Sequence, residues 1–193
     1  MLRIAVLALQ GAYREHILAL KREGIYGFEL KLPHQLEEAD GLIMPGGEST
    51  AIYRLMEKYG FEDQLGCFFK AGKPIWGTCA GMVLLADKDT GMGLGYMDIT
   101  VKRNAYGRQI DSFEETIKTD LGGAKKEFRA IFIRAPKILR TGKNVQVLGS
   151  LNGEAVMARE VNVLACSFHP ELGPDPGIHD YFIEMVKNNK GEN

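Results

Sequence analysis

Pro74-Ile75-Trp76-Gly77-Thr78-Cys79-Ala80-Gly81-Met82-Val83-Leu84-Leu85 joins a short apolar strand to an apolar helix. Gly77 and Gly81 flank the cysteine and allow a sharp turn without a side-chain clash. This G-x-C-x-G pattern is typical of a nucleophile elbow, which holds a reactive side chain at the carboxyl end of a central strand. The helix N-terminus favours the thiolate form of Cys79. The stretch therefore predicts an α/β fold with Cys79 as its nucleophile.

Strands and helices alternate on the N-terminal side of this elbow. We expect strands at 3–9, 28–32, 41–44 and 74–78, a helix from about Tyr13, and a helical stretch over 51–70 that breaks near Gly60. The strands are nearly continuous apolar runs, as in parallel strands that are covered on both faces. The pattern predicts a doubly wound, three-layer α/β/α fold with a mostly parallel central sheet.

The C-terminal half contains more strands. After a glycine-rich loop at 87–95, strands are expected at 96–101, 128–133, 145–151, 154–159 and 161–168, with a hairpin turn at Asn152-Gly153. A final helix has Ile178, Phe182, Met185 and Val186 on its inner face. Residues 1–193 therefore read as one domain.

Composition limits the classes of partner. The net charge of −1 gives no electrostatic case for nucleic acid. The three cysteines have no disulfide-like spacing, which suits a reducing cytoplasm. The apolar N-terminal run is too short for a membrane span, and we interpret it as a buried strand.

His169-Pro170-Glu171 supplies a base and an orienting carboxylate for Cys79. Proline disfavours the α region for His169, so we expect an extended segment in which His169 and Glu171 face the same way. Nucleophile, base and carboxylate together indicate acyl transfer. His16 and His179 are expected on helix surfaces or in caps, and His34 in a loop. Cys67 and Cys166 lie in apolar runs and are expected to be buried, and no cluster has the spacing of metal ligands.

Pro45-Gly46-Gly47-Glu48-Ser49-Thr50 has two open interpretations. It could be a plain strand-to-helix loop with a Ser or Thr N-cap. Alternatively, the adjacent glycines could point the N–H of Gly47 into an oxyanion hole, with the N–H of Ala80 as the second donor. A phosphate loop is disfavoured because the Walker lysine and spacing are missing.

Together these residues resemble the triad (class I) glutamine amidotransferases, and within them the glutaminase subunits of two-protein pyridoxal 5′-phosphate synthases. The elbow and His-Pro-Glu are shared by all triad amidotransferases, whereas the segments at 104–109 and 132–136 are much more specific to these subunits. The matching segments are Leu9-Gln10-Gly11-Ala12, Pro45-Gly46-Gly47-Glu48-Ser49-Thr50, Trp76-Gly77-Thr78-Cys79-Ala80-Gly81, Asp98 to Gln109 with Asn104-Ala105-Tyr106-Gly107-Arg108-Gln109, Phe132-Ile133-Arg134-Ala135-Pro136 and Ser167-Phe168-His169-Pro170-Glu171-Leu172.

The resemblance implies a flavodoxin-like amidotransferase fold and a glutaminase that needs no cofactor or metal. It implies a triad of Cys79, His169 and Glu171. The residues it implies for glutamine binding are Gly47, Glu48, Ser49, Arg108, Ile133 and Arg134. The implied partner is a (β/α)8-barrel synthase subunit that receives the ammonia and makes pyridoxal 5′-phosphate.

Two other classes of function stay open from the sequence. One is a cysteine hydrolase of the peptidase and deglycase group, which would ignore glutamine. The other is a regulatory binding module, which would not need a complete triad. The short 87–95 loop and the Gly/Pro-rich 173–177 segment depart from the family pattern, and neither touches a matched catalytic position.

Overall fold

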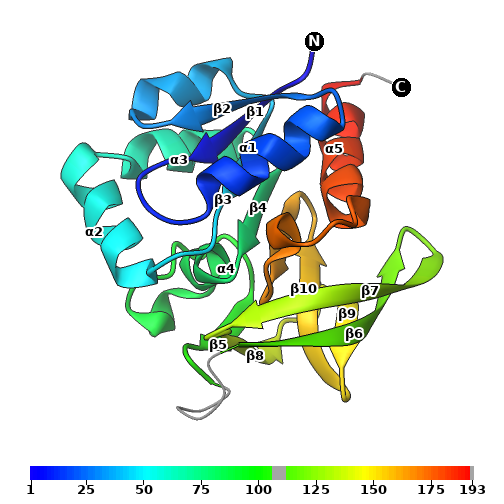
Figure 1. Ribbon diagram of the computed structural model, residues 1–193. Coiled ribbons are helices and arrows are strands. Elements are labelled where there is room, and N and C mark those ends of the chain that lie inside the picture. The colour runs from blue at the N-terminus through cyan, green and yellow to red at the C-terminus, as the bar shows by residue number, and fades with distance from the viewer. Residues whose placement is uncertain (106–111, 192–193) are drawn as a thin grey trace.

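A computed structural model describes residues 1–105 and 112–191. Its main sheet has nine strands in the order β2-β1-β3-β4-β11-β10-β9-β6-β7 (Figure 1). In chain order these strands are β1 Arg3–Leu7, β2 Tyr26–Leu30, β3 Gly41–Met44, β4 Ile75–Thr78, β6 Ser112–Leu121, β7 Ala124–Ile133, β9 Gln146–Leu151, β10 Glu154–Glu160 and β11 Val163–Cys166.

The half of the sheet that contains β2, β1, β3, β4 and β11 is parallel. Helices α1 (Tyr13–Arg22) and α5 (Gly177–Lys190) cover one face of it, and α2 (Ser49–Tyr59), α3 (Glu62–Lys70) and α4 (Ala80–Leu85) cover the other (Figure 1). Successive side chains of β1 point to opposite faces of the sheet. Ile4 and Val6 pack with α1 and α5, whereas Ala5 and Leu7 pack with α2 and α3. The predicted three-layer α/β/α class is confirmed.

The other half of the sheet is antiparallel. The Asn152-Gly153 hairpin is confirmed, with φ of +50° and +82°. Two strands were not predicted, β6 and β8 (Lys137–Thr141), of which β8 pairs with β5 (Ile99–Lys102) in a small second sheet. Strand β6 is hard to recognise because only Ile117 and Thr119 of its side chains are buried, in an otherwise polar stretch.

Several local expectations can be compared with the structure. The predicted break at Gly60 is confirmed, since this glycine ends α2 with φ +70°. Cys166 is buried as expected, but Cys67 is exposed, because it lies on the outer side of α3. Short 3-10 turns lie at η1 (Pro33–Glu38), η2 (Lys88–Thr90) and η3 (Pro170–Leu172). Within the described ranges, every helix is too short or too polar to cross a membrane.

Candidate active site

Cys79 lies between the end of β4 and the start of α4. Its backbone has φ +48° and ψ −102°, a strained conformation for a residue with a side chain. The flanking glycines are required by close packing. A Cβ on Gly77 would lie 2.5 Å from the carbonyl carbon of Gly81, and one on Gly81 would lie 1.9 Å from the oxygen of Met44. The elbow predicted from the sequence is therefore present, and Cys79 is the residue with the strained backbone conformation.

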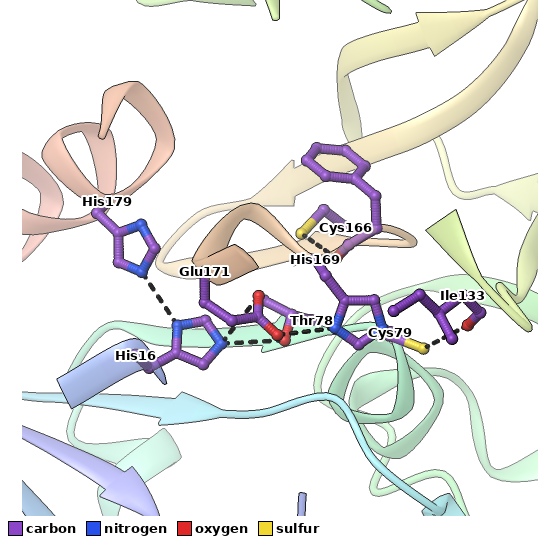
Figure 2. A network of polar contacts seen from close by, with 9 residues as sticks. His16, Thr78, Cys79, Ile133, Cys166, His169, Glu171 and His179 are labelled. Carbon is purple, nitrogen blue, oxygen red and sulfur yellow. Dashed lines mark hydrogen bonds and ion pairs between the residues drawn. The ribbon is translucent and has the colours of Figure 1, made fainter. Parts of the chain in front are cut away.

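His169 follows β11, and its Nδ1 lies 2.7 Å from Oε1 of Glu171 (Figure 2). The expected extended segment is only partly right. His169 has φ −112° and ψ 83°, but Pro170, Glu171 and Leu172 form the 3-10 turn η3. That turn brings the carboxylate back to the ring. The backbone N–H of His169 donates to the oxygen of Ile131 at 2.8 Å, which ties the segment to β7.

The electrostatics of this pair favour a charged imidazole. Burial alone would lower the pKa of His169, but its hydrogen bonds to Cys79 and Glu171 raise that pKa from 6.5 to about 10. Burial would raise the pKa of Glu171, yet its contacts with His16 and His169 hold that pKa below its ordinary value. The arrangement places a charged imidazole beside the nucleophile.

A cavity of about 210 Å³ opens over the elbow. It is smaller than the roughly 300–1,000 Å³ pockets that take drug-sized ligands, and so suits a molecule of amino-acid size. Sγ of Cys79 lies 3.8 Å from the carbonyl oxygen of Ile133. The expected site residues that line the cavity are Gly47, Glu48, Ser49, Cys79, Ala80, Ile133, Arg134 and His169.

Glu48 occupies the N-cap position of α2, where a Ser or Thr cap was one of two expectations. Its carboxylate accepts from the N–H of Thr50 at 3.2 Å. It also accepts from the guanidinium of Arg103 at 3.1 Å. The side chain of Glu48 is therefore held at the cavity wall by both a cap and an ion pair.

Two arginine side chains line the cavity within the described ranges, Arg103 and Arg134. The sequence-based assignment chose Arg134 and Arg108, and Arg108 lies outside the described residues. Arg103 was missed. The available signal was its position directly before Asn104, in the same segment that pointed to Arg108.

Hydrogen bonds join the loop after β1 to the loop after β3 at the cavity wall. Oε1 of Gln10 accepts from the N–H of Glu48 at 2.8 Å, and the N–H of Ala12 donates to the oxygen of Gly46 at 2.9 Å. A Cβ on Gly47 would lie 2.5 Å from Oε1 of Gln10. Gly47 is therefore needed for this close approach.

His16 and His179 are buried, which corrects the expectation that they lie on helix surfaces or in caps. His16 shares the inner face of α1 with Leu20, and His179 is buried on α5 between Ile178 and Phe182. Helical spacing was the signal in the sequence. His16 lies four residues before Leu20, and His179 lies three residues before Phe182, so each shares a helix face with a buried apolar side chain.

Comparison with known proteins gives the family. The model of the SNO glutamine amidotransferase family matches residues 6–188. The chain is 49% identical over 193 residues to the pyridoxal 5′-phosphate synthase subunit PdxT of Halalkalibacterium halodurans, covering 98% of this chain and 97% of that protein. It is 48% identical to the subunit of the same name from Thermotoga petrophila over 189 residues, covering 96% of this chain and 100% of that protein.

A solved structure agrees with this result. A crystal structure described as a glutamine amidotransferase superposes with a TM-score of 0.88 and 44% identity, covering 95% of this chain and 98% of the other. Near-complete coverage at this identity leaves no large part of the described fold unmatched. The chain therefore belongs to the SNO glutamine amidotransferase family.

Proposed function

We propose that this chain hydrolyses L-glutamine to L-glutamate and ammonia through a triad of Cys79, His169 and Glu171. One observation carries the proposal: a cysteine on a strained elbow shares a cavity with an imidazole that is paired to a buried carboxylate at 2.7 Å. Family membership supports the choice of a glutamine amide as the substrate.

The reaction follows from the roles of these groups. The Cys79 thiolate attacks the side-chain amide carbon of glutamine, and the backbone N–H groups of Gly47 and Ala80 bind the oxyanion. His169 gives its proton to the amide nitrogen, the C–N bond breaks and ammonia leaves a γ-glutamyl thioester. His169 then takes a proton from water, whose oxygen displaces the thiolate and forms glutamate. Glu171 orients the imidazole throughout.

Substrate recognition needs opposite charges at the two ends of the amino acid. The Glu48 carboxylate at the cavity wall suits the α-ammonium, and a guanidinium suits the α-carboxylate. Gly47, Ser49, Ile133 and Arg134 stay in this proposal, as does Arg108. We add Arg103, because it lines the cavity and contacts Glu48 at 3.1 Å.

The ammonia passes to a synthase subunit, which we propose to be a (β/α)8 barrel that makes pyridoxal 5′-phosphate. The relatives are named as subunits of pyridoxal 5′-phosphate synthase. We place the complex in the cytoplasm, because all three cysteines are free thiols. Residues 1–193 act in it as one amidotransferase domain.

Docking of this partner is proposed to switch the glutaminase on. In a resting state the N–H of Gly47 would point away from the oxyanion, and docking would turn it inward through the contact between Gln10 and Glu48. One such donor is worth roughly 2.7–4 kcal/mol in a transition state, about 10²–10³ in rate.

The test is glutamate and ammonia release from L-glutamine by the chain alone and with increasing synthase subunit. We expect low activity alone and a large rise on titration. Cys79→Ala should abolish both, because the nucleophile is lost. The matched control is Cys67→Ala, an exposed thiol on α3 that should leave turnover unchanged. Full activity of the free chain would refute the switch, and normal turnover by Cys79→Ala would refute the triad.

A further inference from the structure

Two further histidines, His16 and His179, lie on the side of Glu171 that faces away from His169 (Figure 2). The Glu171 side chain is fully buried. Oε1 is bound by His169, but within the described residues Oε2 has no hydrogen-bond partner. The polar atom that faces it is Nε2 of His16, at 3.4 Å. A buried carboxylate oxygen needs a donor, and His16 is placed to provide one.

Pairing with the carboxylate requires a particular tautomer of His16. An ionised carboxylate only accepts hydrogen bonds, so Nε2 of His16 has to carry the proton for this pairing. The same atom lies 3.2 Å from Oγ1 of Thr78, the residue directly before the nucleophile. Nδ1 of His16 then carries a lone pair, and Nε2 of His179 lies 3.1 Å from it and can donate.

These contacts form one chain. Nε2 of His179 lies 3.1 Å from Nδ1 of His16, Nε2 of His16 lies 3.4 Å from Oε2 of Glu171, and Nδ1 of His169 lies 2.7 Å from Oε1 of Glu171. His16 comes from α1 and His179 from α5, the two helices on the same face of the sheet (Figures 1 and 2). The carboxylate is therefore contacted by a histidine on each side.

The surroundings keep His16 uncharged. It is packed against Trp76 and Thr78 of β4, His179 of α5 and Glu171 of η3, with Glu15 beside it on α1. Burial lowers the pKa of His16 and of His179. A neutral donor satisfies Oε2 without adding a second positive charge, so the carboxylate charge remains available to the His169 imidazolium.

We propose that His16 is a positioning residue of the triad, which holds Oε2 of Glu171 through its Nε2–H while His179 fixes its tautomer. The proposal rests on the glutaminase function proposed above. It predicts an effect on turnover rather than on glutamine binding, because His16 is not among the described residues that line the cavity.

The test compares two neutral amides at position 16 in the complex with the synthase subunit. The amide nitrogen of glutamine can take the place of Nε2, so His16→Gln keeps a donor for Glu171. His16→Asn is shorter and places its amide near the position of Nδ1, on the side of His179. We expect His16→Asn to lower kcat roughly 10- to 100-fold with KM unchanged, the rate equivalent of one unpaired buried acceptor. His16→Gln should recover most of that loss.

A second readout does not depend on turnover. The His169 imidazole is followed by NMR in Cys67→Ala, His16→Gln and His16→Asn proteins, and its pKa should fall in His16→Asn alone. His179→Phe removes the donor to Nδ1 at similar volume, and a smaller loss of kcat is expected. His34→Asn, which changes an exposed histidine on the 3-10 turn η1, is the control variant.

The outcomes separate the two proposals. A wild-type complex that forms no glutamate from glutamine refutes the glutaminase, while the His169 titration still tests the positioning role. Equal kcat and equal His169 titration in the Asn and Gln variants overturn the positioning role. So does a loss of kcat of the same size in both variants with an unchanged His169 pKa, because that result indicates packing alone.

Discussion

Gly46 lies directly against the imidazole of His169. A Cβ on Gly46 would lie 2.3 Å from Cε1 and 2.8 Å from Nδ1 of that ring, and 3.3 Å from Cβ of Cys79. The base is thus held between its carboxylate on one side and a bare backbone on the other. The first glycine of the Gly46-Gly47 pair sets the position of the base, and the second contacts Gln10.

Gly46→Ala should therefore inactivate the glutaminase while the chain stays folded. The added methyl must displace the His169 ring, and a displacement of about 1 Å in a catalytic group costs about 10²-fold in rate. Gly66→Ala is the matched control: it lies inside α3 with open space around its Cβ position, so it should leave turnover unchanged and stabilise the fold by up to about 1 kcal/mol. Glutamate release measures the turnover of both variants, and urea denaturation measures their stability.

Arg103→Ala should weaken glutamine binding more than it slows chemistry. A charged hydrogen bond is worth about 1.5–3 kcal/mol, which corresponds to a rise in KM of roughly 10- to 100-fold. Arg129→Ala serves as control, because Arg129 forms an exposed ion pair with Glu114 at 2.7 Å on the β6–β7 hairpin. Steady-state kinetics on Arg103→Ala and Arg108→Ala distinguish the two assignments. An unchanged KM in Arg103→Ala with a raised KM in Arg108→Ala would support the assignment made from sequence.

The His169 imidazole should remain protonated well above neutral pH, since its pKa is raised to about 10. The same shift means that His169 stabilises the fold fully below pH 6.5, and that this contribution is lost as the pH rises through about 10. Cys79→Ala removes one of the groups that raise the pKa, so the value should fall. NMR titration of the imidazole in Cys79→Ala and Cys67→Ala measures the difference; equal values in the two variants would contradict the hydrogen bond between Cys79 and the imidazole.

Acid should destabilise the protein through its buried neutral histidines. Burial lowers the pKa of both His16 and His179, the latter from 6.5 to about 3. Below pH 6.5 the unfolded chain therefore binds more protons than the folded one, and the free energy of unfolding falls by about 1.4 kcal/mol per pH unit for each such proton. Glu171 adds to this fall only below about pH 4.5, because its folded pKa is lowered from 4.5.

Urea denaturation at pH 7, 6 and 5 measures this slope. His179→Phe should flatten it, because one of the two protons is no longer taken up on unfolding. His34→Asn, at an exposed position on the 3-10 turn η1, is the variant for comparison. Identical slopes in His179→Phe and the wild type would show that His179 is not the group that titrates.

The sequence alone was sufficient for features that depend on neighbours along the chain. The elbow around Cys79 follows from the sterics of Gly77 and Gly81, and the Asn152-Gly153 turn from the freedom of its backbone. The parallel half of the sheet follows from apolar runs such as 41–44. In each case a short-range rule acts within a few residues, so the pattern can be read without the fold.

Only the tertiary structure decided what surrounds these elements. His16 and His179 meet at 3.1 Å although 163 residues separate them, because α1 and α5 pack on the same face of the sheet. Arg103 reaches the cavity because it directly follows β5 and its side chain is bound by Glu48 at the N-terminus of α2. Strand β6 exists because β7 and β9 pair with it, despite its polar composition. A buried polar group or a polar strand is stable only once distant partners supply its hydrogen bonds, and no local pattern contains those partners.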